Sequence, residues 1–389
     1  MIESGLPPVT VSVGGRFHAF DLAKQLHIRG ALHRLITSYP KFKVREWGIP
    51  NDKVANILSH DILCRVAYRT SLFHSVKRAC QYSLTARWGR LAAELVPDDV
   101  KLFVGWSSMS IESIRRAKNL GAKTIVERGS THIKFQDKIL TEAYEGAGLK
   151  WEGIHPGLIE REMQEYAEAD HIAVPTTFVR DSFAQYGIPT SKIFVVPYGC
   201  SLSAFRPSPK RDDVFRVIHC GQISIRKGAH LLIQAFNELK LKNAELWLIG
   251  GLSPEISTVL DRVANPAIQV KGPFPQTQLA QYYSQGSVFC IPSWEEGLAM
   301  VIPQALSCGL PVVATFNSGA PELVQDGRTG FLIPAGNVEA IKEKLLQLYE
   351  DRDLLAQMAA NVAAGGEIDL SWDRYGASIA GEYLKVVRA

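Results

Sequence analysis

Short runs of apolar, β-branched residues alternate with helix-forming stretches along almost the whole chain, and this alternation limits the folds open to it. Strands separated by helices form parallel sheets built from βαβ units, so we expect an α/β protein with two such sheets. The first series of runs predicts strands at residues 9–13, 100–104, 124–126, 171–174 and 193–196. The second series predicts strands at residues 215–220, 244–249, 267–270, 288–291 and 311–314.

A polar segment at residues 206–213, RPSPKRDD, lies between the two series. It is rich in proline and charge and has no apolar periodicity, which is typical of a domain boundary. The 389 residues suffice for two domains, each with its own core. We predict a first domain at residues 1–205 and a second at 206–370, with a cleft between them. The helix in residues 371–389 follows the second domain, and its packing back on the first domain is left open.

Composition narrows the class of protein. Hydrophobic residues make up 46% of the chain and charged residues 21%, and no apolar run is long enough to span a bilayer. Residues 1–15 lack the basic start and apolar core of a secretory signal, so we expect a cytoplasmic protein. The six cysteines include no CxxC pair, and the DRD string at residues 351–353 is interpreted as surface charge, so no metal is predicted. A formal charge of +4 does not indicate nucleic-acid binding.

Basic residues gather in the first domain. Between residues 53 and 95 there are seven Lys or Arg against two acids, interleaved with aromatic residues. This pattern favours one or two amphipathic helices that lie on an anionic membrane surface or gather an anionic acceptor, and a solvated helix face is the alternative. The residues predicted to contact the acceptor or the membrane are Arg65, Arg69, Lys77 and Arg78.

Two cations stand at the start of a predicted helix in the second domain. The strand at 215–220 runs into Gly221, and the loop that follows ends in Arg226 and Lys227 before an amphipathic stretch. Positive side chains are unfavourable at the positive end of a helix dipole unless an anion occupies the site. We therefore expect Arg226 and Lys227 to bind a diphosphate, with solvated side chains as the other interpretation.

The segment at residues 292–315, PSWEEGLAMVIPQALSCGLPVVAT, predicts a strand end, a turn and a helix. Pro303 lacks an N–H and is tolerated only in a first turn, so the helix cannot begin much before Ala299. The N–H groups of residues 298–302 are then expected to be free to face a ligand. Glu296 stands just before them, where a carboxylate suits sugar hydroxyl groups; a helix-dipole charge is the alternative.

Several long motifs, in order, resemble the family 4 retaining glycosyltransferases. This resemblance covers most of the chain and is strongest over residues 195–336. It implies the GT-B fold, in which two Rossmann-like parallel-sheet domains face an interdomain cleft. The motifs that carry it are VVPYGCSLSAFRP, GQISIRKGAHLLIQAF, LWLIGG, PSWEEG and SGAPELVQDGRTGFLIPAGN.

The resemblance also implies roles for single residues. In that family the lysine that matches Lys227 binds the donor diphosphate with a nearby basic residue, and the glutamate that matches Glu296 holds donor-sugar hydroxyls. The second acid of the motif usually binds ribose and is Gln304 here, which keeps hydrogen bonding but removes a charge. The family's usual arginine after the first glycine is Gln222 here, so we expect Arg226 to take part of its work.

In the first domain, the turn that contains Gly14 and Gly15 looks like the family's glycine turn beside the donor phosphates. Relatives carry a histidine near the reacting sugar, and in the segment ERGSTH three residues compete for that place, Glu127, Arg128 and His132. The predicted catalytic residues are Glu296, Lys227, Arg226, His132 and Arg128. The predicted donor-binding residues are Gly14, Gly15, Gly221, Gln222, Gly251, Gly297, Leu298, Ala299, Met300 and Gln304.

Taken with the charge pattern, the resemblance implies transfer of a hexose-type sugar from a nucleoside diphosphate donor, with UDP favoured, and with retention of configuration. No cofactor or metal is expected. The expected acceptor is lipid-linked or a polysaccharide in cell-envelope glycan synthesis, assembled by a cytoplasmic enzyme on the inner membrane face. The alternatives are a GT-B epimerase or phosphorylase, or a sugar-nucleotide-binding protein with weak catalysis.

Overall fold

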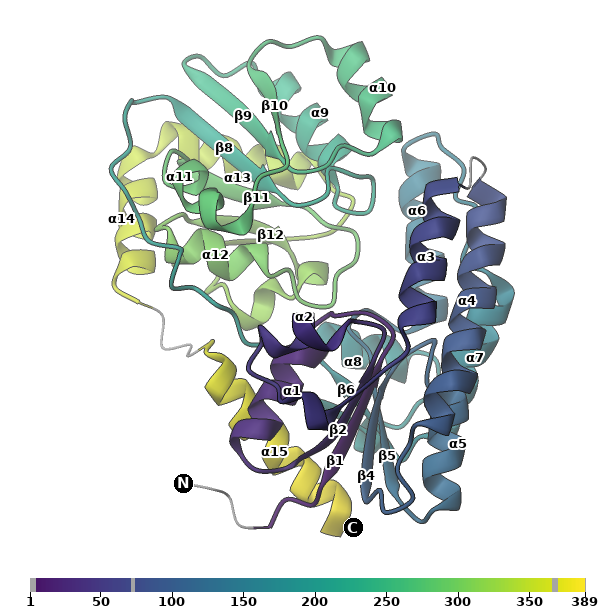
Figure 1. Cartoon of the computed structure of the whole chain (residues 1–389). Helices are drawn as coiled ribbons and strands as arrows, with labels where there is room; N and C mark the ends of the chain where they lie inside the picture. The colour runs from purple at the N-terminus through teal and green to yellow at the C-terminus, as the bar shows by residue number, and fades with distance from the viewer. Residues whose placement is uncertain (1–4, 71–73, 366–369, 389) are drawn as a thin grey trace.

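The computed structural model describes residues 5–70, 74–365 and 370–388, and it leaves the side chains of residues 68–77 undescribed. Within this part of the chain the strands form two sheets, one of seven strands and one of six, and the pairings are parallel. Figure 1 shows each sheet inside its own domain, with the second domain stacked on the first. The expected α/β architecture of two parallel-sheet, Rossmann-like domains is confirmed.

The first strand of each series lies inside its sheet, and later strands add on both sides of it. In the first sheet the spatial order is β3 (Val54–Asn56), β2 (Leu32–Thr37), β1 (Val9–Val13), β4 (Leu102–Trp106), β5 (Lys123–Glu127), β6 (His171–Val174) and β7 (Ile193–Val195). In the second sheet it is β10 (Ile268–Gly272), β9 (Ala244–Ile249), β8 (Phe215–Cys220), β11 (Val288–Ile291), β12 (Val312–Thr315) and β13 (Gly330–Ile333). In such sheets ligands bind at the carboxyl ends of the strands, where the strand order reverses.

The central strands are buried because both faces of each sheet are covered by helices. Every residue of β1 and of β8 is buried. Their β-branched side chains therefore pack on both sides of the pleat instead of alternating with solvent-facing polar residues. This packing fixes the two glycine-containing turns that follow β1 and β8 at the mouth of the cleft.

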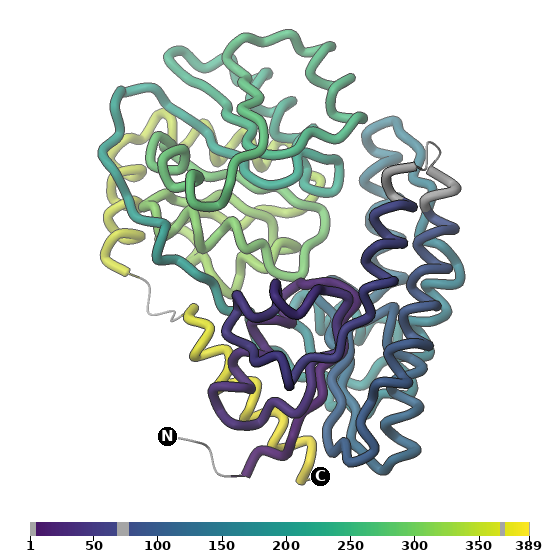
Figure 2. The backbone as a smooth tube through the Cα atoms, viewed as in Figure 1, coloured from purple at the N-terminus to yellow at the C-terminus, as the bar shows by residue number. Residues whose placement is uncertain are grey.

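Helices of the first domain include a pair that extends beyond the sheet. In Figures 1 and 2, α3 and α4 run side by side and rise along the right edge of the view toward the second domain. The helices of this domain are α1 (Ala19–Ile28), α2 (Lys41–Arg45), α3 (Leu58–Thr70), α4 (His74–Glu94), α5 (Ile111–Asn119), α6 (Ile133–Gly146), α7 (Pro156–Glu168) and α8 (Thr177–Ala184).

The last helix leaves the second domain and packs on the first. In Figure 1, α15 lies beside α1, and Arg29 of α1 donates hydrogen bonds to the Asp373 carbonyl oxygen at 2.8 Å and to its carboxylate at 3.0 Å. Tyr375, Ile379 and Tyr383 of α15 are buried in this contact. The remaining helices are α9 (Ala229–Leu239), α10 (Pro254–Val263), α11 (Leu279–Tyr283), α12 (Val301–Ser307), α13 (Val338–Glu350), α14 (Arg352–Ala363) and α15 (Trp372–Arg388).

A backbone contact between Gly221 and Gly250 closes the turns after β8 and β9. Gly250 has a φ of +142°, and a Cβ atom on it would lie 1.7 Å from the carbonyl oxygen of Gly221. A side chain at position 250 would therefore meet both backbone strain and a clash that no rotamer relieves. The neighbouring Gly251 has open space around the corresponding position.

We predict that Gly250→Ala lowers the free energy of unfolding by about 2 kcal/mol or more, because the turn cannot keep its conformation with a Cβ atom. Gly251→Ala is the matched control and is expected to change it by less than about 0.5 kcal/mol. Urea denaturation of the two variants checks this. Equal stability of the two would show that the close approach is not required.

Candidate functional site

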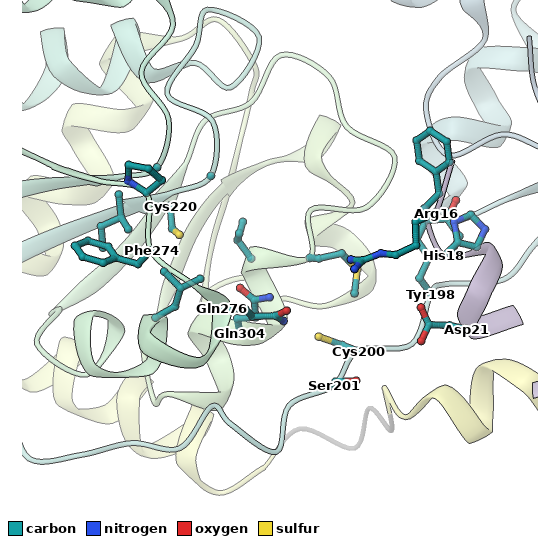
Figure 3. Close-up of a pocket in the computed structure, with 18 of the residues that line it drawn as sticks. Arg16, His18, Asp21, Tyr198, Cys200, Ser201, Cys220, Phe274, Gln276 and Gln304 are labelled. Carbon is teal, nitrogen blue, oxygen red and sulfur yellow. The ribbon is translucent and has the colours of Figure 1, made fainter. Parts of the chain in front are cut away.

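A cavity of about 510 Å³ opens between the two domains. Figure 3 shows Arg16, His18 and Asp21 on the wall formed by the first domain, with Phe274 and Gln304 on the opposite wall. Side chains from both domains thus face one space at the carboxyl ends of both sheets, where open parallel sheets bind ligands.

The turn after β1 forms the first wall. Gly14 packs closely against the Trp88 ring, and its carbonyl oxygen accepts a hydrogen bond from the Ser38 hydroxyl at 2.8 Å. This tight turn carries His18 into the cavity lining, where its ring centroid lies 4.0 Å from that of Tyr198 and its Nε2 lies 3.3 Å from Glu127 Oε2. Two neighbours therefore hold the imidazole in one orientation.

Lys227 and Glu296 form an ion pair, and neither residue belongs to the lining of this cavity. The Lys227 ammonium contacts the Glu296 carboxylate, and the Arg226 guanidinium lies 3.9 Å from the same carboxylate. Burial raises the pKa of the Cys220 thiol, which lines the cavity, and the Lys227 charge is among the influences that oppose this rise. The structure thus brings together the three residues predicted to act on the donor, outside the cavity lining.

Helix α12 begins at Val301 and has Pro303 in its first turn, as the sequence predicts. The expectation that all N–H groups of residues 298–302 are free was partly wrong. Ala299 N–H donates to Ser318 O at 3.0 Å, and Ile302 N–H donates to Ala299 O at 2.9 Å. The Ser318 carbonyl oxygen satisfies the first group and a turn before the helix satisfies the second, so neither N–H is free to bind a ligand.

Gln304 lies in α12 and lines the cavity, with its Oε1 accepting a hydrogen bond from the Tyr283 hydroxyl at 3.3 Å. Of the other predicted donor-binding residues, Gly221 and Met300 also line the cavity. Gln222 is exposed and outside the lining. The other predicted donor-binding residues also lie outside the lining: Gly14, Gly15, Gly251, Gly297, Leu298 and Ala299.

His132 lies outside the residues that line the cavity, and its catalytic role stays a prediction. Its side chain is 0% exposed, caps α6 by accepting from Lys134 N–H, and stacks on the Tyr186 ring at 4.5 Å between centroids. Burial lowers the pKa of His132 to about 4, so the imidazole is neutral at physiological pH.

Arg128 is likewise buried and outside the cavity lining, and its catalytic role also stays a prediction. Its guanidinium donates to Glu162 at 2.8 Å, to Gln136 at 2.9 Å and to the Thr131 carbonyl oxygen at 2.9 Å. These bonds use nitrogen atoms on every side of the group. Arg128 therefore stabilises the conformation of the segment ERGSTH through buried hydrogen bonds.

Sequence reasoning missed several cleft residues. Asp21, Tyr198 and Trp372 line the cavity, although they come from α1, from the segment after β7 and from α15. Glu295, the neighbour of Glu296, is fully buried between the domains. The only sequence signal for Glu295 is the pair of adjacent acids in the PSWEEG segment. In the described part of the chain, no three His, Cys, Asp or Glu side chains form a group that can hold a metal ion.

The predicted basic region forms α3 and α4. Arg65 is exposed and pairs with Asp61 at 2.8 Å, and Arg78 is half-buried. Arg69 and Lys77 lie outside the residues whose side chains are described. Helix α3 also exposes apolar side chains, which the sequence analysis did not predict, and Ile62 is 60% exposed. The exposed apolar residues of this helix, here called the α3 apolar face, are Leu58, Ile62, Leu63 and Val66.

Asp21, which lines the cavity, makes the stability of the folded protein depend on pH. Burial raises the pKa of Asp21 from 3.8 to about 6, and the charges of His18 and Arg16 oppose that rise. A carboxyl group with a higher pKa in the folded protein binds protons more tightly there, so its contribution to stability falls as the pH rises from about 4 to about 6.

We predict that Asp21→Asn raises the free energy of unfolding at pH 8 by about 1–2 kcal/mol, because an amide avoids the cost of a buried charge. The gain is expected to disappear below about pH 4, where the carboxyl group is protonated in both states. Denaturation curves over this pH range check it, with the exposed Asp52→Asn as control. A less stable Asp21→Asn protein at pH 8 would contradict the assignment.

Comparison with known proteins agrees with this geometry. Residues 214–351 match the family model "Glycosyl transferases group 1". A D-inositol 3-phosphate glycosyltransferase of Streptomyces bingchenggensis is 27% identical over 252 residues, which cover 58% of this chain and 55% of that protein. The chain spans about half the length of the first curated relatives that it matches.

Solved structures match nearly the whole chain. Sucrose-phosphate synthase from Thermosynechococcus elongatus has a TM-score of 0.71 at 17% identity, over 98% of this chain and 99% of that one. HepE of Anabaena, in complex with UDP, has a TM-score of 0.69 at 17% identity, over 97% and 99%. The solved structures show that the whole chain has this fold, and the family model matches only residues within the second domain. Residues 214–351 thus resemble the group 1 glycosyl transferases, and the whole chain shares the two-domain GT-B fold of these solved structures.

Proposed function

We propose that the protein transfers a hexose-type sugar, with retention of configuration, from a nucleoside diphosphate donor to a lipid-linked or polysaccharide acceptor in cell-envelope glycan synthesis. The observation that carries this proposal is the Lys227–Glu296 ion pair, with Arg226 beside it, in the domain whose Gly221 and Gln304 line the interdomain cavity. A cation suits the departing diphosphate, and a carboxylate suits the hydroxyl groups of the sugar. UDP is the favoured nucleotide, since HepE, which shares the fold, binds it.

The chemistry that we propose is electrostatic. Lys227 and Arg226 stabilise the negative charge that develops on the leaving diphosphate, so that transfer proceeds without a metal ion. Glu296 is paired with Lys227, and Glu295 is enclosed by hydrogen-bond donors, so neither is placed as a free nucleophile. This supports a route without the covalent intermediate that retaining glycosidases form.

We predict that Lys227→Ala and Glu296→Ala each lower kcat/KM for sugar transfer by about 100-fold or more, because each removes a charge that acts on the donor. Release of nucleoside diphosphate from a panel of nucleotide sugars measures this. The matched controls are Lys344→Ala and Glu343→Ala, which break an exposed ion pair on α13 and are expected to keep full activity.

Other outcomes would point to the alternatives. Full activity in both cleft variants would mean that the site lies elsewhere. Donor binding without release of nucleoside diphosphate would favour a binding protein, and conversion of the donor without an acceptor would favour an epimerase. Dependence on inorganic phosphate would favour a phosphorylase.

We further propose that the first domain rests on the anionic inner membrane face, where a lipid-linked acceptor is presented. The α3 apolar face and the exposed Arg65 support this, because an amphipathic helix binds such a surface through buried apolar area and basic charge. None of the helices in the described residues combines the length and hydropathy needed to cross a bilayer. Association through a surface helix needs no such span.

We predict that the protein sediments with vesicles containing anionic lipid and that reversal of charge at Arg65, Arg69, Lys77 and Arg78 abolishes this, since each basic residue adds about 1 kcal/mol of attraction. Replacing Ile62 by Ser is expected to weaken binding at all salt concentrations, whereas the charge effect fades in high salt. No sedimentation of the wild-type protein, or binding that survives both changes, would end the membrane part of the proposal.

A further inference from the structure

A single buried carboxylate joins the two domains next to the donor site. Glu295 is 0% exposed and belongs to the second domain, in the turn after β11. Its Oε1 accepts hydrogen bonds from the Thr131 N–H and hydroxyl, both at 2.9 Å, and from the Ser130 hydroxyl at 2.5 Å. Its Oε2 accepts from Gln136 at 3.1 Å and from Arg226 at 3.0 Å. All of these donors except Arg226 come from the first domain.

The hydrogen-bond donors around Glu295 offset the energetic cost of burying its charged carboxylate. Burial on its own would raise the pKa of Glu295, but the Arg226 charge, the Ser130 hydroxyl and the Thr131 N–H together lower it to about 2. The carboxylate therefore stays charged across the physiological range. An uncompensated carboxylate in this place would be costly, so the contact depends on both domains being together.

The same carboxylate is tied to the donor side of the cleft. Arg226 Nε donates to the Glu295 carbonyl oxygen at 3.1 Å as well as to its carboxylate, and the Arg226 carbonyl oxygen accepts from Trp294 N–H at 2.9 Å. Glu296 follows directly in the chain, and its N–H donates to Asn317 O at 2.9 Å. Movement of Glu295 would therefore move Arg226 and the backbone of Glu296.

Two further contacts, one from the ERGSTH loop and one from Thr176 at the start of α8, hold the first domain against this turn. A Cβ atom on Gly297 would lie 2.0 Å from the carbonyl oxygen of Gly129, so the two backbones approach as closely as glycine permits. The Thr176 hydroxyl donates to the Gly297 carbonyl oxygen at 3.0 Å. The interface around Glu295 is thus a fitted contact between the segment ERGSTH and the segment PSWEEG.

From these contacts we infer that Glu295 is a positioning residue, which holds the Ser130–Thr131 loop of the first domain against the second and so sets the position of the first domain relative to Lys227 and Glu296. It touches no substrate, because it has no exposed surface. The inference rests on the proposed sugar transfer for its kinetic consequence. Its structural consequence stands independently and is measured without substrate.

Amide hydrogen exchange is the first test. The Thr131 N–H donates to Glu295, so Glu295→Ala is expected to speed exchange in a peptide that covers residues 128–132 by about 10-fold or more. Exchange within β5 is expected to stay as in the wild-type protein, which shows that the domain is still folded. Unchanged exchange at residues 128–132 would overturn the inference, whether or not the protein transfers sugar.

Kinetics are the second test. Glu295→Ala is expected to lower kcat by about 10-fold or more while the donor KM stays within about 3-fold, since Lys227 and Glu296 remain. Glu295→Gln keeps an acceptor for the Thr131 N–H and is expected to restore part of the rate. A residue with a merely structural role would lower the melting temperature and leave kcat of the folded protein unchanged, and that result would overturn the inference.

The matched control is Glu322→Gln. Glu322 also joins the domains, by accepting from the Thr177 N–H and hydroxyl at 2.8 Å, but it is tied to no donor-site residue by these contacts. We expect the kcat of Glu322→Gln to stay close to that of the wild-type protein.

If Glu295 variants fail to fold, the double variant Ser130→Ala and Thr131→Val removes two donors from the other domain and is expected to give the same fall in kcat. An unchanged kcat in that double variant would overturn the inference.

Discussion

The buried carboxylate of Glu295 is the interaction through which the two domains and the donor site depend on one another. A charge without exposed surface is stable only where donors surround it, and here those donors come from the Ser130–Thr131 loop, Gln136 and Arg226. The relative position of the domains is therefore set by specific hydrogen bonds as well as by apolar packing. Because Arg226 takes part, the same bonds define the cation closest to the Lys227–Glu296 pair.

The cleft follows from elementary constraints on the chain. Parallel strands place all their carboxyl ends at one edge of each sheet, and the two sheets turn those edges toward a shared cavity. Glycine at the turns after β1, β8 and β9 allows the backbone to approach closely, and Pro303 sets where α12 begins. These constraints bring residues from opposite halves of the chain, His18 and Gln304 among them, to one space.

Much of the fold is predictable from local pattern. The strands at 9–13, 171–174, 215–220, 244–249 and 288–291 match β1, β6, β8, β9 and β11, because parallel strands covered by helices are rich in apolar, β-branched residues. The strands β2, β3 and β13 were missed. The apolar run of β2 is broken by His33 and Arg34, β3 has only three residues, and β3 and β13 are edge strands with a single neighbour. The site is predictable only in part, since Glu295 contacts Thr131, 164 residues away in the sequence. The burial of His132 also depends on distant residues, because its ring packs against Tyr166 and Tyr186.

The central claim is that the interdomain cleft binds a nucleoside diphosphate sugar, and a thermal-shift panel tests it most directly. Ligand at 100 times its Kd adds about 2.7 kcal/mol to the stability of the folded state, which raises the melting temperature by several degrees. The account predicts such a rise with one or more nucleotide sugars and their nucleoside diphosphates, and a much smaller rise with free sugars or nucleosides, which lack the diphosphate that Lys227 and Arg226 bind. No rise with any nucleoside diphosphate or nucleotide sugar at millimolar concentration would contradict the account.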